Sequence, residues 1–165
     1  MNPVSHSKLT HLNTAGEAQM VDISSKASTV RTAKASACIH MSKEAFHTIQ
    51  TGNAPKGDVL ATARIAGIMA AKKTADVIPM CHAISLTKVE IDIQPLSSGD
   101  GYQIQTTCCT KGQTGVEMEA LTAASVTALT LYDMAKALDK TMVISDLKLI
   151  FKSGGVSGHF SRHDP

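Results

Sequence analysis

Apolar and polar side chains alternate over three stretches of the chain, which is the pattern of half-buried β-strands. The first stretch runs from Val30 to Met41, the second from Leu86 to Gln94 and the third from Tyr102 to Cys109. Serine and glycine residues at 97–101 separate the last two stretches, so these are predicted to pair as a β-hairpin. A final strand is expected over residues 142–151.

Helical patterns fill the remaining segments. Ser42 is a predicted N-cap for a short helix through Ile49. A longer helix, rich in small residues, is expected after Lys56-Gly57-Asp58 and up to about Val77, and a second small-residue helix ends near Leu138. The order of the elements predicts an α+β fold, the ferredoxin-like (split βαβ) arrangement. It would have a four-stranded antiparallel sheet, both long helices on one face and one extra short helix.

The composition restricts the class of protein. Charged residues make up 18% of the 165 residues and hydrophobic residues 43%, so we expect part of the surface to be covered by other subunits. A net charge of +2, no Trp and only five aromatic residues argue against a nucleic-acid-binding protein. No stretch approaches the ~20 apolar residues of a membrane span. The four cysteines lack CxxC spacing, which favours reduced thiols and a cytoplasmic location.

Candidate chemistry is concentrated between Lys111 and Leu138. Asp133 and Lys136 are three residues apart, so they share one face of the predicted helix. The neighbouring side chains are mostly apolar, and a partly buried Lys beside a carboxylate can serve as an acid or a base. The alternative is a solvated ion pair.

Glu117 and Glu119 leave two interpretations open. In an extended segment before the helix, the two carboxylates would share a face, and the local alternation favours this arrangement. The alternative is a capping box from Thr114 to Glu117, in which Glu117 only accepts a backbone N–H.

Several cations lie beside predicted element ends or glycine turns, namely Arg31, Lys56, Lys136 and Lys152. Together they suit a polyphosphate ligand, and Lys56 is expected at a helix N-terminus that favours anions. The motifs GxxxxGK[ST] and GxGxxG are absent, which excludes a P-loop and a Rossmann site. His82 is either a hydrogen-bond donor to a ligand or a surface residue, because adjacent Cys81 and His82 seldom bind one metal.

Five long motifs make the chain resemble the molybdenum cofactor biosynthesis protein C family. They are MVDIS at 20–24, KGDVLATARIAGIMAAKKT at 56–74, IPMCH at 78–82, TGVEMEALTAASVTALTLYDMAKA at 114–137 and KSGGVSG at 152–158. The resemblance covers nearly the whole chain, with Met80 at a position where the family often has leucine.

The resemblance implies a pyrophosphate-releasing lyase. Its substrate would be 3′,8-cyclo-7,8-dihydroguanosine 5′-triphosphate, supplied by a radical-SAM enzyme that acts on GTP, and its product cyclic pyranopterin monophosphate. The family's catalytic residues map to Asp133, Lys136 and Lys56. Its substrate contacts map to Met80, Cys81, His82, Met118 and Glu119, with Glu117, Arg31 and Lys152 lining the pocket.

The resemblance also implies an assembly and a domain organisation. We expect a homohexamer, a trimer of dimers, with sites at the dimer interface. Residues 1–15 are predicted to be a flexible segment, 16–158 a single ferredoxin-like catalytic domain and 159–165 a C-terminal tail. The sequence requires no cofactor and no protein-bound metal, although magnesium could accompany the triphosphate.

Two other classes of protein remain. A non-catalytic purine-nucleotide-binding module of the same fold would bind GTP derivatives without needing Asp133 and Lys136. An assembly protein would use these polar residues in salt bridges between subunits.

Overall fold

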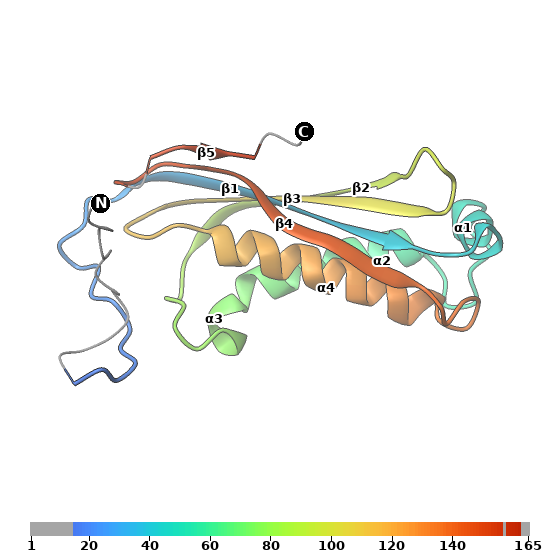
Figure 1. Ribbon diagram of the computed structural model, residues 1–165, viewed down its shortest axis with the longest axis horizontal. Coiled ribbons are helices and arrows are strands. Elements are labelled where there is room, and N and C mark those ends of the chain that lie inside the picture. Colours follow the sequence, from blue (N-terminus) through green and yellow to red (C-terminus); the bar gives the residue numbers. More distant parts are fainter. Residues whose placement is uncertain (1–14, 157, 163–165) are drawn as a thin grey trace, which may run out of the picture.

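The computed structural model describes residues 15–156 and 158–162, and Figure 1 shows one antiparallel sheet covered by helices on one face. The order of the strands across the sheet is β2-β3-β1-β4-β5. In chain order the strands are β1 (Thr29–His40), β2 (Leu86–Pro95), β3 (Gly101–Gly112), β4 (Val143–Ser153) and β5 (Phe160–Ser161).

The helices are α1 (Lys43–Gln50), α2 (Val59–Lys72), α3 (Thr74–Val77) and α4 (Glu117–Ala135). The long helices α2 and α4 lie side by side under the sheet, and α1 lies at one end of it (Figure 1). The predicted N-cap of α1 is confirmed, because the Ser42 side chain accepts a hydrogen bond from the backbone N–H of Ala45. No helix in the described part of the chain is long and apolar enough to cross a membrane.

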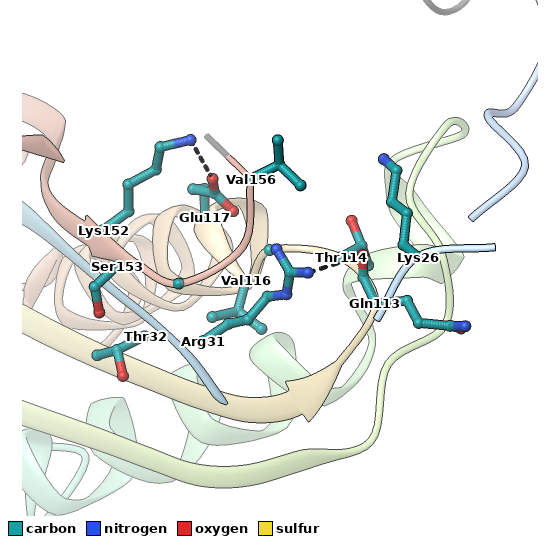
Figure 2. A pocket seen from close by; sticks show the side chains of 12 residues that line it. Lys26, Arg31, Thr32, Gln113, Thr114, Val116, Glu117, Lys152, Ser153 and Val156 are labelled. Atoms are coloured by element: carbon teal, nitrogen blue, oxygen red, sulfur yellow. Dashed lines mark hydrogen bonds and ion pairs between the residues drawn. The ribbon is translucent and has the colours of Figure 1, made fainter. Parts of the chain in front are cut away.

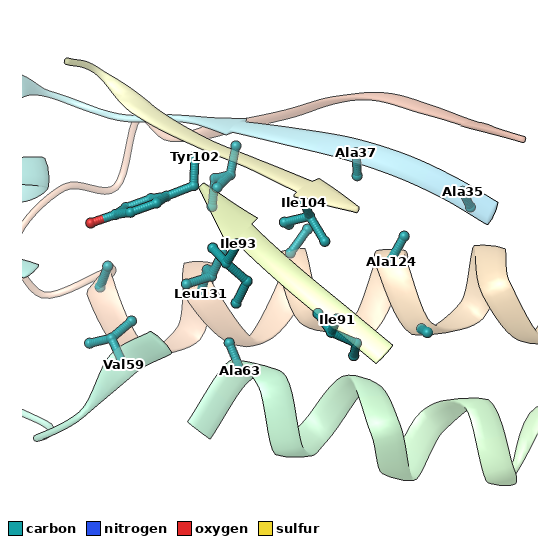
Figure 3. Packing of buried hydrophobic residues seen from close by; sticks show 14 of the residues in the cluster. Ala35, Ala37, Val59, Ala63, Ile91, Ile93, Tyr102, Ile104, Ala124 and Leu131 are labelled. Atoms are coloured by element: carbon teal, nitrogen blue, oxygen red, sulfur yellow. The ribbon is translucent and has the colours of Figure 1, made fainter. Parts of the chain in front are cut away.

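The core lies between the sheet and the two long helices. The alternation in β1 turns Ala33, Ala35, Ala37 and Ile39 toward the helices, where they are fully buried. Figure 3 shows Ile104 of β3 above α4, which carries Ala124 and Leu131, and Ile91 and Ile93 of β2 beside the two long helices. Small side chains on β1 and α4 let the helices approach the sheet closely, so both helices are held in fixed positions.

The expected hairpin is confirmed by the antiparallel pairing of β2 with β3. The prediction of four strands is wrong, because Phe160 and Ser161 pair with Lys152 and Phe151 as a fifth strand. A two-residue strand is too short to show alternation, so the sequence pattern did not reveal it.

The two long helices end earlier than predicted. The helix expected after Lys56-Gly57-Asp58 begins at Val59 with Asp58 as its N-cap, but it ends at Lys72, and residues 74–77 form the separate helix α3. The helix expected to reach Leu138 ends at Ala135. The flexibility predicted for residues 1–15 concerns a segment that, apart from Ala15, lies outside the described residues. Residues 163–165 of the predicted tail also lie outside them.

Candidate active site

A groove made of two adjoining pockets lies where α4 begins, with volumes of about 210 Å³ and about 330 Å³. Lys26, Thr114, Gly115 and Glu117 line both pockets, so the two hollows are continuous. The side chains come from β1, β4, the loop before α4 and the segment before β1, which are far apart in the sequence.

The first pocket is rich in cations, with Lys26, Arg31 and Lys152 around it (Figure 2). Arg31 donates from Nε to the carbonyl oxygen of Gly112 at 3.0 Å and from Nη2 to that of Gln113 at 3.2 Å. These bonds fix the guanidinium at the edge of the pocket. Gly155 lies against it at φ +75°, and a Cβ at that position would overlap the guanidinium.

Lys152 and Glu117 form an ion pair across the same pocket, with 3.1 Å between Nζ and Oε1 (Figure 2). Both side chains are less than one-third exposed, at 28% and 30%. The Glu117 carboxylate lies against Gly115, where any Cβ would overlap it. The Glu117 carboxylate thus balances one of the three positive charges of Lys26, Arg31 and Lys152. The first pocket keeps a net positive charge.

The second pocket contains the other predicted substrate contacts. Met80, Cys81 and His82 reach it from the connection between α3 and β2, and Met118 and Glu119 from the first turn of α4. Burial, followed by the nearby charge of Glu117, raises the pKa of Glu119, which is only 4% exposed. Burial and the Glu119 charge also raise the pKa of the Cys81 thiol. Cys81 is therefore protonated at neutral pH and suited to contact rather than nucleophilic attack.

The structure resolves the two interpretations of Glu117 and Glu119. The favoured extended segment is wrong, because α4 already begins at Glu117. The capping box is also absent, since Val116 is the N-cap and no side chain caps the helix. Two residues on a helix are about 200° apart. Glu119 is therefore buried, whereas Glu117 turns toward Lys152.

A second polar cluster surrounds Asp133. Lys136 Nζ lies 2.7 Å from Asp133 Oδ1, and Lys56 Nζ lies 3.0 Å from Oδ2 and 2.9 Å from the backbone oxygen. The hydrogen bond from Lys136, and then that from Lys56, lowers the pKa of Asp133. The same carboxylate raises the pKa of Lys136. All three side chains are exposed, so the expectation of a partly buried Lys is wrong for a single copy of the chain.

The two groups of predicted residues lie at opposite ends of α4. Glu117 opens the helix and Asp133 is in its last turn, sixteen residues later, which corresponds to about 24 Å along the axis. Within one chain, Lys56 and Lys136 therefore lie apart from Arg31 and Lys152, and the binding of one polyphosphate by all four cations stays a prediction. Lys56 precedes the N-cap Asp58 of α2, and its ammonium group binds the Asp133 carboxylate.

The sequence interpretation missed other residues of the groove. Lys26 lines both pockets, and Gln113 lines the first and donates to the backbone oxygen of Ser24. His82, predicted as a ligand contact or a surface residue, lies 2.8 Å through Nε2 from the backbone oxygen of Val21. The motif at 20–24 was the only signal for this segment, and it carried no indication of contacts.

No protein-bound metal centre can be assigned within residues 15–156 and 158–162. They contain no group of three or more His, Cys, Asp or Glu side chains that could hold a metal ion.

The structure combines a pocket lined by cations, a pocket with a buried carboxyl group and a Lys–Asp–Lys cluster. These groups suit an enzyme that binds a phosphorylated substrate and transfers protons to or from it.

Residues 20–155 match the MoaC family, and the chain belongs to this family. It is 58% identical over 158 residues to a protein of Nostoc sp. named cyclic pyranopterin monophosphate synthase. The match covers 96% of this chain and 94% of that protein. The resemblance recognised in the sequence is thereby confirmed.

Proposed function

We propose that this protein is a cyclic pyranopterin monophosphate synthase of molybdenum cofactor biosynthesis. It converts 3′,8-cyclo-7,8-dihydroguanosine 5′-triphosphate to cyclic pyranopterin monophosphate and releases pyrophosphate. The observation that carries the proposal is the 58% identity to a protein of that name over nearly the full length of both chains. The groove at the start of α4 supports it with chemistry that suits a nucleotide-derived triphosphate.

The two pockets suit the two parts of this substrate. The first pocket would bind the triphosphate, because Lys26, Arg31 and Lys152 can neutralise the negative charge of its phosphates. The second pocket would bind the heterocycle, with Glu119 and Glu117 accepting hydrogen bonds from its N–H groups. Met80, Cys81, His82 and Met118 complete the walls around the ring.

Proton transfer is assigned to the cluster at the other end of α4. The raised pKa of Lys136 keeps its ammonium group protonated at neutral pH, so Lys136 acts as a general acid in ring opening and closure. Asp133 holds the ammonium group in position at 2.7 Å. Lys56 donates to the same carboxylate and is the second lysine within reach of the substrate.

The complete site is proposed to span two copies of the chain. A catalytic acid must lie within hydrogen-bonding distance of the atom that it protonates. In one chain, about 24 Å separates the groove from Asp133, so a second copy would supply its own Lys56, Asp133 and Lys136. Exposed apolar side chains on the long helices, Ile65, Met69 and Leu129, provide surface for such contacts. We propose the homohexamer, a trimer of dimers, as the assembly.

The remaining assignments follow from the same proposal. The order β2-β3-β1-β4 of the four long strands supports the ferredoxin-like arrangement, with residues 16–158 as the catalytic domain. Free thiols at the four cysteines suit a cytoplasmic enzyme. The substrate would come from a radical-SAM enzyme acting on GTP. Magnesium, if required, would bind with the triphosphate rather than in a site of the protein.

The test is an anaerobic incubation of the purified protein with the cyclic dihydro-GTP substrate. Pyrophosphate release and the fluorescent pterin formed after oxidation are followed for wild type and for Lys136→Ala. Product from the wild type alone is expected. A folded, oligomeric wild type that binds the substrate but forms no product would favour the non-catalytic nucleotide-binding module.

A further inference from the structure

Residues 20–26, here called the strap, form a wall of the groove, and the proposed chemistry assigns a role to Lys26 alone among them. Val21, Ile23 and Lys26 line the second pocket, and Lys26 also lines the first. Ile23 additionally lines a third hollow of about 220 Å³ beside His82. The strap therefore borders all three hollows.

The strap has a defined internal shape. The Asp22 carboxylate accepts hydrogen bonds from the backbone N–H and the hydroxyl of Ser24, at 2.8 and 2.7 Å. The backbone N–H of Lys26 donates to the carbonyl oxygen of Ile23 at 2.9 Å, which closes a turn. This turn sets the position from which the Lys26 side chain reaches the groove.

Two side chains of the groove hold the strap from outside. His82 binds the backbone oxygen of Val21, and Gln113 donates from Nε2 to the backbone oxygen of Ser24 at 3.1 Å. Most strap residues are exposed, and the strap belongs to no helix or strand. A segment with so few buried contacts opens more easily than the core. The hydrogen bonds from His82 and Gln113 are therefore important for holding the strap in place.

Gln113 connects the strap to the main cation of the first pocket. Its side chain donates to the strap, while its backbone oxygen accepts from Nη2 of Arg31. Figure 2 shows Gln113 beside Thr114 and Lys26 at the edge of the pocket, with its side chain pointing away from Arg31. One residue thus fixes the relative positions of two groups that face the same hollow.

We propose that Gln113 is a positioning residue that holds the strap closed, so that Lys26 and Arg31 bind the triphosphate end of the substrate together. The proposal rests on the proposed function for the identity of the ligand, but not for the closure of the strap. Gln113 does not contact the reacting atoms in this scheme. Its loss should therefore weaken substrate binding and leave the chemical step unchanged.

The experiment compares wild type with Gln113→Ala and Gln113→Glu, which remove the donor but keep the backbone oxygen that Arg31 needs. Gln103→Ala, at an exposed glutamine on β3, the strand that ends just before Gln113, is the matched control. Hydrogen exchange of residues 20–26 is measured with and without inorganic pyrophosphate, and kcat and KM are measured with the cyclic dihydro-GTP substrate.

We expect faster exchange in the strap of both Gln113 variants, with wild-type exchange in the core strands. KM should rise about tenfold, as for the loss of one well-placed hydrogen bond, while kcat stays unchanged. Pyrophosphate should slow exchange in the wild-type strap and do so less in the variants. Unchanged strap exchange in both folded variants would overturn the proposal, as would a fall in kcat with an unchanged KM.

The proposed function and the closure of the strap are tested by different measurements, synthase activity and hydrogen exchange. A wild type without synthase activity would remove the proposed function, yet strap exchange in Gln113→Ala would still test closure. If Gln113→Ala does not fold, Gln113→Glu carries the test through strap exchange, because its side chain has nearly the same size and its carboxylate has no donor, although it adds a negative charge.

Discussion

At the scale of single residues, Glu119 is a carboxyl group that the fold removes almost completely from water. It is a carboxyl group on the first turn of α4, and burial raises its pKa. The folded state therefore favours its protonated form, which carries both a donor and an acceptor. A group of this kind suits recognition of a heterocycle better than it suits stability.

We expect Glu119→Gln to stabilise the protein at neutral pH and to impair catalysis. A raised folded-state pKa means that Glu119 stabilises the fold below its ordinary pKa of 4.5 and loses that contribution as the pH rises through the folded-state value. The stability gap between variant and wild type should therefore widen above pH 4.5 and then level off. Thermal unfolding across pH measures it, at about 2–4 °C for each kcal/mol. A gap independent of pH would contradict the buried, protonated carboxyl.

The ion pair of Lys136 with Asp133 leads to a prediction about proton transfer. Lys136→Arg keeps the positive charge but has a pKa above about 12, so it cannot give up a proton readily. We expect substrate binding to persist and kcat to fall by about 10²–10⁴-fold. The unfolding temperature should not change, because both side chains are exposed.

Single-turnover pyrophosphate release checks this expectation, with Lys140→Ala as a control at a nearby exposed lysine. A near-normal kcat in Lys136→Arg would remove Lys136 from the proton-transfer step.

At the scale of elements, the contact between α2 and α4 sets the position of the groove, because α4 carries Glu117 and Glu119. Gly67 of α2 lies against this contact, where an added Cβ would overlap Thr127 Oγ1 and Ile91 Cδ1 and lie 3.0 Å from the Ala123 oxygen. Glycine is thus required for close approach rather than for an unusual φ angle.

Gly67→Ala is expected to lower the free energy of unfolding by about 1–3 kcal/mol through overpacking. The better helix propensity of alanine, about 1 kcal/mol, opposes this effect without cancelling it. Urea denaturation at matched protein concentration measures the difference. Thr62→Ala, at an exposed position of the same helix, should change stability by less than about 1 kcal/mol. If Gly67→Ala were more stable than wild type, α2 and α4 could move apart to make room for the methyl group with little loss of free energy.

At the scale of the whole molecule, the distance between the groove and Asp133 determines what kind of assembly can be active. Lys152 lines the groove and Lys136 belongs to the distant cluster. If each site takes its groove from one copy and its Lys–Asp–Lys cluster from another, the two lysines act in one site from different chains. A dimer with twofold symmetry would contain two such sites.

Coexpression of Lys136→Ala with Lys152→Ala should therefore restore activity that neither variant has alone. Random pairing gives half mixed dimers, each with one intact site, so about one-quarter of the wild-type activity is expected. Differently tagged chains, purified through both tags, remove the unmixed dimers, so the purified mixed dimers should reach about one-half of the wild-type activity in the pyrophosphate assay. Activity no greater than that of the single variants would contradict a site shared between copies.

The sequence by itself determined the elements and the family. Alternation in β1, the N-cap at Ser42 and the hairpin turn are local features, and local geometry decides them. The long motifs identified the family because they record residue identity over most of the chain.

Only the tertiary structure decided which functional side chains lie together. Periodicity did not reveal that α4 begins at Glu117, so it could not show that Glu119 is buried while Glu117 pairs with Lys152. It also could not place Gln113 between Arg31 and the strap. Such contacts join segments tens of residues apart, and their geometry depends on how helices and strands pack. Sequence spacing measures distance along one element only, whereas the site is built from several.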